Sequence, residues 1–323
     1  MQDLFFELLR VSIGQLDCLS RGPSAEEWEK IYQTSRRHGV AGVCYKGIVR
    51  LFEFGLRVPQ DLSLDWMADA EDLREEQELY ESRCDKLMKK LAERKIRAAV
   101  VNGLGMRHHA DNELQHLLRA TSIDVYVDCS MDRLTKFARQ TGQEEIQSGY
   151  TSMPLQVWEN TPVNLYYRLM SARNPFVNKK IQKWFAQNKD MMFSLDDDEI
   201  FVPTLTMNAI CMLQVFQQRL LNGKATMDFL VDYFFVLRQL QGAFQPFKDG
   251  ASLKATLRTL GMTRFAAGVM WVLQEKLALD RQCMLCEPSE AEGRFILCCL
   301  MARKRSFRRL LLHYPMEMVW PGR

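Results

Sequence analysis

Asp124 is the residue of this sequence with the clearest potential for chemistry. It lies in the segment 122–128, where β-branched residues at alternate positions predict a strand. Because the neighbours of Asp124 are apolar, we expect this strand inside a sheet, where a carboxylate needs a partner. Gly103 and Gly105 follow an earlier apolar run, and Arg119 precedes the strand. A structural interpretation stays open, in which Asp124 pairs with Arg119 and the glycines only permit a turn.

The elements that must hold these residues form a small sheet between helical regions. Apolar residues at three- and four-residue spacing predict helices before the sheet, including one long surface helix over 69–95. The apolar run 96–101 predicts a buried strand that enters a tight turn. Ser130 is placed to cap the helix that follows the second strand. Shorter apolar patterns at 155–158 and 163–167 indicate a hairpin.

The remainder of the chain has a helical pattern, interrupted by an acidic run at 196–199 that predicts a solvated turn. We therefore expect an α+β protein, with a small mixed sheet flanked by N-terminal and C-terminal helical regions. The expected boundaries are 1–95 for the N-terminal helices, 96–170 for the core that carries the sheet, and 171–323 for the C-terminal helices.

The segment 95–128 resembles the nucleotidyltransferase superfamily, specifically the bacterial family of uncharacterised nucleotidyltransferases related to DNA polymerase β. In that family a long helix leads to an apolar strand, a Lys-Gly turn, an Arg, and a strand with acids at alternate positions. The same order occurs here in Asn102-Gly103, in Arg119 and in the strand that holds Asp124. The resemblance covers about residues 80–240 and implies a nucleotidyltransferase-like core.

The resemblance also implies a reaction, the transfer of a nucleoside monophosphate from a nucleoside triphosphate to an unknown acceptor with Mg²⁺. Two carboxylates at positions i and i+2 of a strand face the same side, so they can share divalent ions that clamp a triphosphate. A glycine turn lets backbone N–H groups approach phosphates. By this resemblance Asn102, Gly103, Gly105 and Arg119 would contact the nucleotide, and Asp124 would hold the metal.

The chain departs from the family pattern at the positions that carry this chemistry. Asn102 stands at the Lys, Ser122 at the first metal carboxylate, and Asn164 at the candidate third carboxylate, with Tyr166 at its neighbouring His. Asp124 alone remains of the acidic set, and magnesium usually binds one or two carboxylates together with phosphate oxygens.

These departures predict a degenerate member of the family, with weakened or lost catalysis and weak or absent binding of Mg²⁺ and nucleoside triphosphate. Three alternatives stay open. The chain retains catalysis, it binds a nucleotide without turnover, or its cleft and helices bind a protein partner without any nucleotide.

Three other groups of residues could form a metal site or a nucleic-acid surface, but each also has a simpler structural interpretation. His108 and His109 suggest a metal site, but adjacent residues do not share a helix face. Cys283 and Cys286 have the spacing of half a zinc site, but tetrahedral zinc needs four ligands. The segment 303–309 holds five basic residues, which suits a nucleic-acid surface or the C-terminal turns of a helix.

The composition is that of an ordinary globular protein, with 47% hydrophobic and 26% charged residues in a chain of 323. Lys and Arg number 43 and Asp and Glu 40, a surplus of three that is too small to require nucleic acid or a membrane. The nine scattered cysteines suit a reducing compartment, and the N-terminus has acids where an export signal has bases. We expect a cytoplasmic protein that has a nucleotide or a protein as partner.

Overall fold

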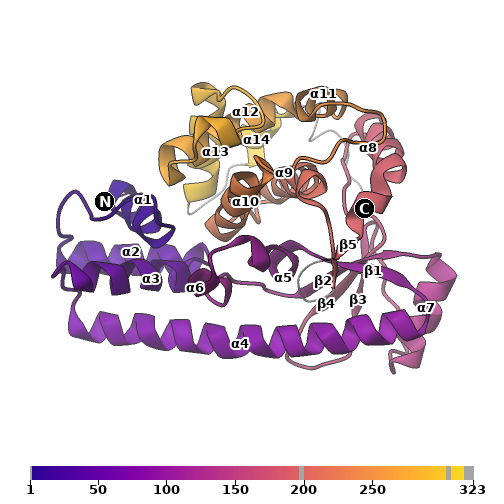
Figure 1. The fold of residues 1–323 in the computed structure, drawn as a ribbon, viewed down its shortest axis with the longest axis horizontal. Helices are drawn as coiled ribbons and strands as arrows, with labels where there is room; N and C mark the ends of the chain where they lie inside the picture. The colour runs from indigo at the N-terminus through magenta and orange to yellow at the C-terminus, as the bar shows by residue number, and fades with distance from the viewer. Residues whose placement is uncertain (1, 196–199, 303–306, 316–323) are drawn as a thin grey trace.

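A computed structural model describes residues 2–195, 200–302 and 307–315 of the chain. The acidic run at 196–199 and residues 303–306 of the basic run lie outside the described residues. Helices surround a small sheet, and one long helix runs beneath both the N-terminal helices and the sheet (Figure 1).

The N-terminal region is helical, as predicted. It consists of α1 (Gln2–Ser12), α2 (Ala25–Arg37), α3 (Ala41–Glu53) and α4 (Gln60–Glu93). Helix α2 starts with a capping box, in which the Ser24 hydroxyl accepts from the backbone N–H of Glu27. The Glu27 carboxylate in turn accepts from the backbone N–H of Ser24.

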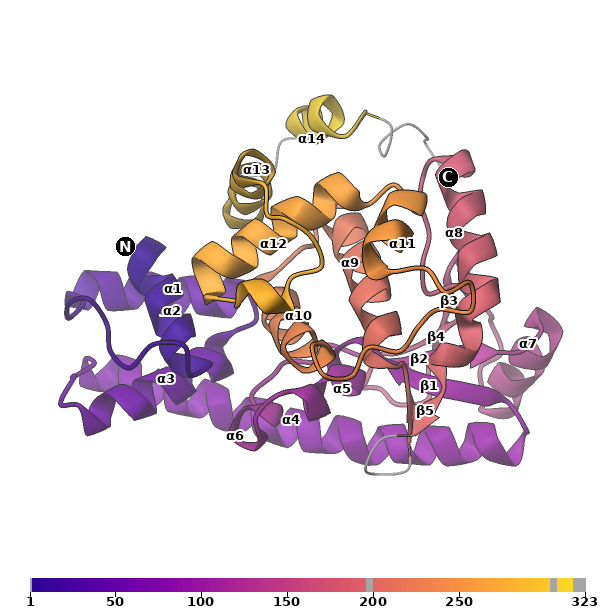
Figure 2. The same ribbon diagram turned by 45° about the horizontal axis from the view of Figure 1, so that its top comes forward.

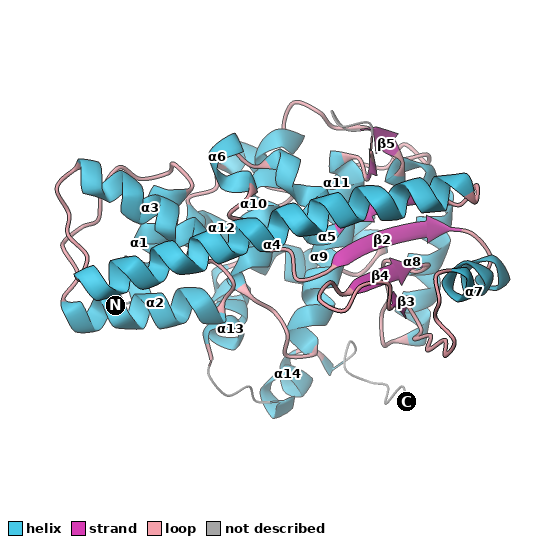
Figure 3. Ribbon diagram, turned by 90° about the horizontal axis from the view of Figure 1, so that it is seen from below, coloured by secondary structure: helices cyan, strands magenta, loops and turns pink. Residues whose placement is uncertain are grey.

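Helix α4 is longer than the sequence predicted, because it begins at Gln60 rather than at residue 69. Its early turns are held by Trp66, which is fully buried and packs edge-to-face against Trp28 and Tyr32 of α2. Its later turns carry buried apolar residues of the hydrophobic cluster that lies under the sheet. Seen from below, α4 crosses the sheet along its length (Figure 3), so it joins the N-terminal helices to the core.

The main sheet has four strands in the order β1-β2-β4-β3. The strands are β1 (Arg97–Val101), β2 (Ile123–Asp128), β3 (Ser152–Leu155) and β4 (Val163–Tyr166). Strand β2 is antiparallel to β1 and parallel to β4, and β4 is antiparallel to β3. The α+β class with a small mixed sheet is therefore confirmed. A separate pair, β5 (Ser194–Leu195) and β6 (Phe201–Val202), is antiparallel.

The predicted hairpin is present as β3 and β4, but its first strand lies at 152–155 rather than at 155–158. In β3 the buried side chains of Met153 and Leu155 alternate with exposed Pro154, which is the pattern of a strand with one covered face. The helix predicted after β2 is α7 (Met131–Gln140), and the Ser130 hydroxyl caps it by accepting from the N–H of Arg133.

The segment predicted as a tight turn after β1 is instead a short helix, α5 (Asn102–Met106). It continues into a 3₁₀ turn at Arg107–His109 and then α6 (Asn112–Gln115). Asn102 has a φ of 54°, a left-handed conformation that asparagine tolerates better than most residues. One residue therefore turns the chain from strand into helix.

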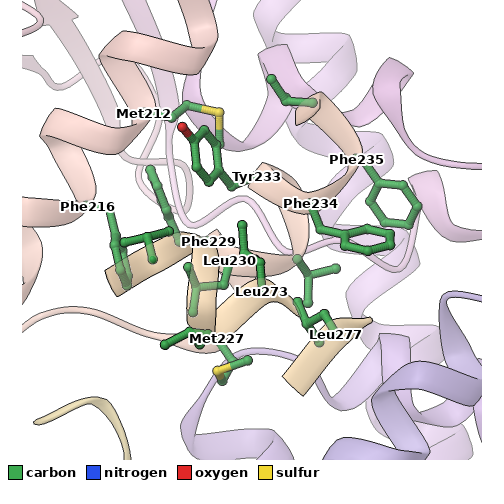
Figure 4. Packing of buried hydrophobic residues seen from close by; sticks show 14 of the residues in the cluster. Met212, Phe216, Met227, Phe229, Leu230, Tyr233, Phe234, Phe235, Leu273 and Leu277 are labelled. Atoms are coloured by element: carbon green, nitrogen blue, oxygen red, sulfur yellow. The ribbon is translucent and has the colours of Figure 1, made fainter. Parts of the chain in front are cut away.

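The C-terminal region is helical and lies on the opposite side of the sheet from α4 (Figures 1 and 2). Its helices are α8 (Pro175–Asn188), α9 (Leu205–Leu221), α10 (Met227–Leu240), α11 (Leu253–Thr259), α12 (Thr263–Leu277), α13 (Glu290–Met301) and α14 (Phe307–His313); 3₁₀ turns lie at Lys189–Met192 and Arg281–Cys283. Helices α9 and α10 are apolar on almost every side, and Phe216 stacks on Phe229 between them (Figure 4).

One hydrophobic cluster joins the C-terminal helices to the N-terminal ones. The Arg10 guanidinium of α1 also donates to the backbone carbonyl of Lys276 in α12, at 3.2 Å. Within the described ranges, no helix combines the length and the apolar character needed to cross a membrane.

Candidate functional site

The Asp124 carboxylate is buried, with 4% of the residue exposed, and it accepts three hydrogen bonds. The donors are Asn102 Nδ2 at 2.7 Å, Ser122 Oγ at 2.7 Å and Asn164 Nδ2 at 2.9 Å. These are three of the four positions at which the sequence analysis found a departure from the expected family pattern. The side chains that the resemblance places at the positions of a lysine and two acids thus converge on Asp124.

The register of the sheet explains this convergence. Asn164 lies directly beside Asp124 across the parallel pair of β2 and β4. Ser122 precedes Asp124 by two residues, so it faces the same side. Val101 pairs with Asp124 across β1 and β2, and Asn102 follows it at the start of α5. Three segments that are distant in the sequence therefore bring neutral donors to a single buried anion.

Tyr166 is two residues beyond Asn164 in β4 and is influenced by the same carboxylate. Burial raises the pKa of the Tyr166 phenol, and the negative charge of Asp124 raises it further. Tyr166 is therefore a neutral phenol at physiological pH, and it adds no charge to the site.

Gly103 and Gly105 allow α5 to pack closely on its neighbours. A Cβ atom on Gly103 would lie 2.8 Å from the Cβ of Ala120, and one on Gly105 would lie 2.5 Å from the carbonyl oxygen of Val100. Both glycines therefore have a packing role that explains their presence without a phosphate.

Arg119 is exposed at the edge of the site. The hydrogen bonds and ion pairs described for the chain do not join it to Asp124, so the alternative pairing of these two residues is not formed. Arg119 and Gly103 both line a cavity beside Asp124, together with Asn102 and Ser122. Gly105 faces Val100 instead.

Gln77 of α4 fixes the loop that leads into β2. Its side chain accepts from the backbone N–H of Ala120 at 2.9 Å and donates to the carbonyl of the same residue at 3.2 Å. Arg107 donates to the Gln77 side chain, to Glu81 and to the Leu118 carbonyl. Burial lowers the pKa of Arg107, and the Glu81 carboxylate opposes that shift. The long helix thus sets the position of the segment that carries Arg119 and Ser122.

The cavity beside Asp124 has a volume of about 30 Å³. That is room for about two groups the size of water, far less than the roughly 300–1,000 Å³ of small-molecule sites. Part of its wall comes from α9 and α10, through Arg219, Asp228 and Asp232.

These three residues were not assigned to the site by the sequence analysis. The sequence does contain a pattern that could have indicated Asp228 and Asp232. Asp228 and Asp232 are four residues apart in an otherwise apolar helix, so they share one face of a buried element. Two of the buried hydrophobic residues labelled in Figure 4, Met212 and Phe229, also line the cavity.

A larger groove of about 470 Å³ lies between the N-terminal helices and the core. Arg36, Asp69, Asp72, Glu76 and Arg119 are among the residues that line it. Arg36 is engaged by Asp69, with Nε 3.3 Å from Oδ2. Arg119 lines both the groove and the small cavity.

The other candidates from the sequence have structural partners. Nδ1 of His109 lies 2.7 Å from Oε1 of Gln239, and burial, with a smaller effect of His108, lowers the pKa of His109 to about 4. Cys283 Sγ is 3.6 Å from the Gln241 side chain. Across the described part of the chain, no three His, Cys, Asp or Glu side chains are grouped so that they could hold a metal ion.

Comparison with known proteins gives the class of this protein. The model of a family described as "Uncharacterised nucleotidyltransferase" matches residues 24–278, and the chain belongs to that family. The crystal structure of an antigenic nucleotidyltransferase-like protein from Paracoccidioides brasiliensis is similar with a TM-score of 0.39 and 10% identity, over 70% of this chain and 98% of that chain. No curated protein sequence matches the chain.

The residues around Asp124 do not fit the two metal ions that the resemblance implies. Magnesium requires oxygen ligands, but Asn102 and Asn164 direct amide N–H groups at the carboxylate and Ser122 directs its hydroxyl hydrogen there. The acids Asp228 and Asp232 do not join Asp124 in a group that could hold a metal, within the residues described. No chemical step through a metal is derived for this site.

Proposed function

We propose that this chain is a nucleotidyltransferase-family protein that keeps the fold and has lost two-metal nucleotidyl transfer. The hydrogen bonding of Asp124 carries this proposal. In a two-metal site the carboxylate oxygens bind cations that stabilise the attacking and leaving oxygens. Here Asn102, Ser122 and Asn164 occupy those oxygens with neutral donors, so a metal at Asp124 would have to displace buried hydrogen bonds.

The same proposal extends to the nucleotide. The cavity beside Asp124 is too small for a triphosphate, and the wider groove presents Asp72 and Glu76, which repel phosphates when no metal screens them. Magnesium-dependent binding of nucleoside triphosphates is therefore expected to be weak or absent.

Thermal-shift and calorimetric titrations test this proposal directly. Each nucleoside triphosphate is added at about 1 mM with and without magnesium, because a ligand that binds only the folded state raises the melting temperature. We expect no magnesium-dependent shift for the wild-type protein. A magnesium-dependent shift that disappears in Asp124→Asn would overturn the proposal. Ser122→Ala is the matched control, since it removes one donor and keeps the carboxylate.

A reconstructed site provides the positive comparison. The triple variant Asn102→Lys, Ser122→Asp, Asn164→Asp places the family residue types back around Asp124. We expect it to be less stable than wild type without magnesium, because three carboxylates then repel one another in a buried site. We expect magnesium to restore part of that stability, while it leaves the wild-type melting temperature unchanged.

A further inference from the structure

Asp232 is a buried carboxylate that lacks the partners Asp124 has. It is 7% exposed and lines the small cavity. None of the hydrogen bonds or ion pairs described for the chain involves its carboxylate, and its charged neighbours act on it only through space. The Asp232 oxygens are not among the fully buried side-chain atoms without a partner, so they open onto the cavity. An ionised carboxylate with so little contact with solvent is costly, and an added hydrogen-bond donor in the cavity would lower that cost.

The groups around Asp232 do not supply it with a hydrogen-bond donor. Asp228, one turn earlier on α10, accepts from the backbone N–H of Phe229 at 2.7 Å and adds a second acid to the cavity. Arg219 also lines the cavity, with its guanidinium 5.0 Å from the centre of the Phe229 ring. Burial raises the pKa of Asp232, Asp228 raises it further, and Arg107 and Arg219 oppose the shift. Burial likewise raises the pKa of Asp228.

The cavity adjoins the large groove. Arg119 lines both spaces, and Gly39 of the groove lies against Asp228, since a Cβ on Gly39 would be 2.8 Å from Asp228 Oδ2. The two spaces therefore lie next to each other.

The groove carries acids at helical spacing. Asp69, Asp72 and Glu76 lie on one face of α4 and span roughly 10 Å along its axis. Asp69 is paired with Arg36, and the Glu76 carboxylate accepts long hydrogen bonds from Tyr80 at 3.3 Å and Gln77 at 3.4 Å. Both Asp72 and Glu76 line the groove.

The combined lining is acidic. Six acidic and three arginine side chains line the groove and the cavity, so acidic side chains outnumber basic ones by three. The carboxylates are spread along the two spaces, and the described residues hold no group of three that could bind a single metal ion. This arrangement suits a ligand whose positive charges are also spread along its length.

We propose that the groove and the cavity together bind a linear polyammonium molecule, with a terminal ammonium group beside Asp232. An ammonium group is about the size of water and donates three hydrogen bonds, so it fits the cavity and supplies the donors that Asp232 lacks. The rest of the molecule lies along Asp69, Asp72 and Glu76.

Calorimetric titration with spermidine tests the proposal, in about 150 mM NaCl so that non-specific surface attraction is screened. We expect saturable binding that Asp232→Asn weakens at least about tenfold, with a smaller loss in the double variant Asp72→Asn, Glu76→Gln. Asp85→Asn is the control, because this exposed residue lies on α4 about 20 Å along the helix from Asp72. It should bind as wild type does.

Proton release distinguishes the buried site from loose surface binding. An ammonium group beside Asp232 favours the ionised carboxylates of α10, so binding should release protons at a pH at which the raised pKa values keep these groups protonated. Titrations in buffers of different ionisation enthalpy measure this release, which should disappear in Asp232→Asn. If that variant does not fold, Asp228→Asn takes its place.

The proposal is overturned if spermidine does not bind, if a folded Asp232→Asn variant binds as wild type does, or if Asp85→Asn weakens binding equally. None of these readouts involves a nucleotide or magnesium. Their failure is therefore distinguishable from failure of the proposed loss of catalysis.

Discussion

Asp124 and Asp232 are buried acids that line the same cavity from opposite elements, and they differ in almost every other respect. Asp124, on a strand, has three neutral donors within hydrogen-bond distance. Asp232, on a helix, has no hydrogen-bond donor among the described residues, and Asp228, Arg107 and Arg219 act on it only through space. The protein therefore supplies hydrogen-bond donors to the acid on the strand and none to the acid on the helix, among the residues described. Stability measurements can therefore separate the two acids.

The largest effect is expected for Asp124→Ala. The substitution leaves the donors of Asn102, Ser122 and Asn164 without their acceptor, and unsatisfied buried donors cost about 1–3 kcal/mol each without being additive. We expect the free energy of unfolding to fall by about 2–4 kcal/mol, as measured by urea denaturation. An equal loss in Asp232→Ala would break the comparison between the two acids.

Gly105→Ala should have the next largest effect, because the new Cβ would lie 2.5 Å from the Val100 carbonyl oxygen. Helix α5 must then move, and Asn102 moves with it away from Asp124. Overpacking of this kind costs about 1–3 kcal/mol. Gly242→Ala is the matched control, since a Cβ there has nothing within 4 Å, and its melting temperature should match that of wild type.

Asp232→Asn should change the pH dependence of stability. The folded pKa of Asp232 is raised above its ordinary value of 3.8, so its contribution to stability is fully present below that value. It is lost as pH rises through the folded pKa. The variant should therefore be more stable than wild type at pH 7, by about 1.4 kcal/mol for each pKa unit of the shift.

The extra stability of the variant should shrink toward pH 4. There the Asp232 carboxyl of the wild-type protein is protonated, so it is as neutral as the amide of the variant. Denaturation curves between pH 4 and pH 8 measure it. A difference that does not change with pH would show that Asp232 is already ionised and paired.

Lys189→Ala should have the smallest effect. Lys189 pairs at 2.8 Å with Asp128, an acid at the end of the strand that carries Asp124, and both side chains are partly exposed. Ion pairs of this kind contribute about 0.2–1 kcal/mol. We expect a loss in that range at low salt and almost none at 1 M salt, where the screening length falls to about 3 Å. A loss as large as that of Asp124→Ala would show that burial is not what separates these acids.

Local parts of the fold were predictable because local interactions decide them. The hydroxyl of Ser130 caps α7, and β-branched residues form β2, as their neighbours in the sequence indicate. The start of α4 was not predicted, because Trp66 is stabilised there by Trp28 and Tyr32 from another helix. The segment after β1 is a helix rather than a turn, and its close approach to Val100 is possible because Gly105 has no side chain.

The candidate site also has features that the sequence indicates and features that depend on packing. The sequence indicated Asp124 as the candidate acid, and it showed neutral residues, Asn102, Ser122 and Asn164, where the resemblance implies a lysine and two acids. Only the tertiary structure decided that Asn102, Ser122 and Asn164 donate to that acid, since strand register and the turn into α5 bring them together. It also decided that Asp228 and Asp232 reach the same cavity. Hydrogen bonds act over about 3 Å, and such distances between remote segments are set by packing rather than by neighbours in the chain.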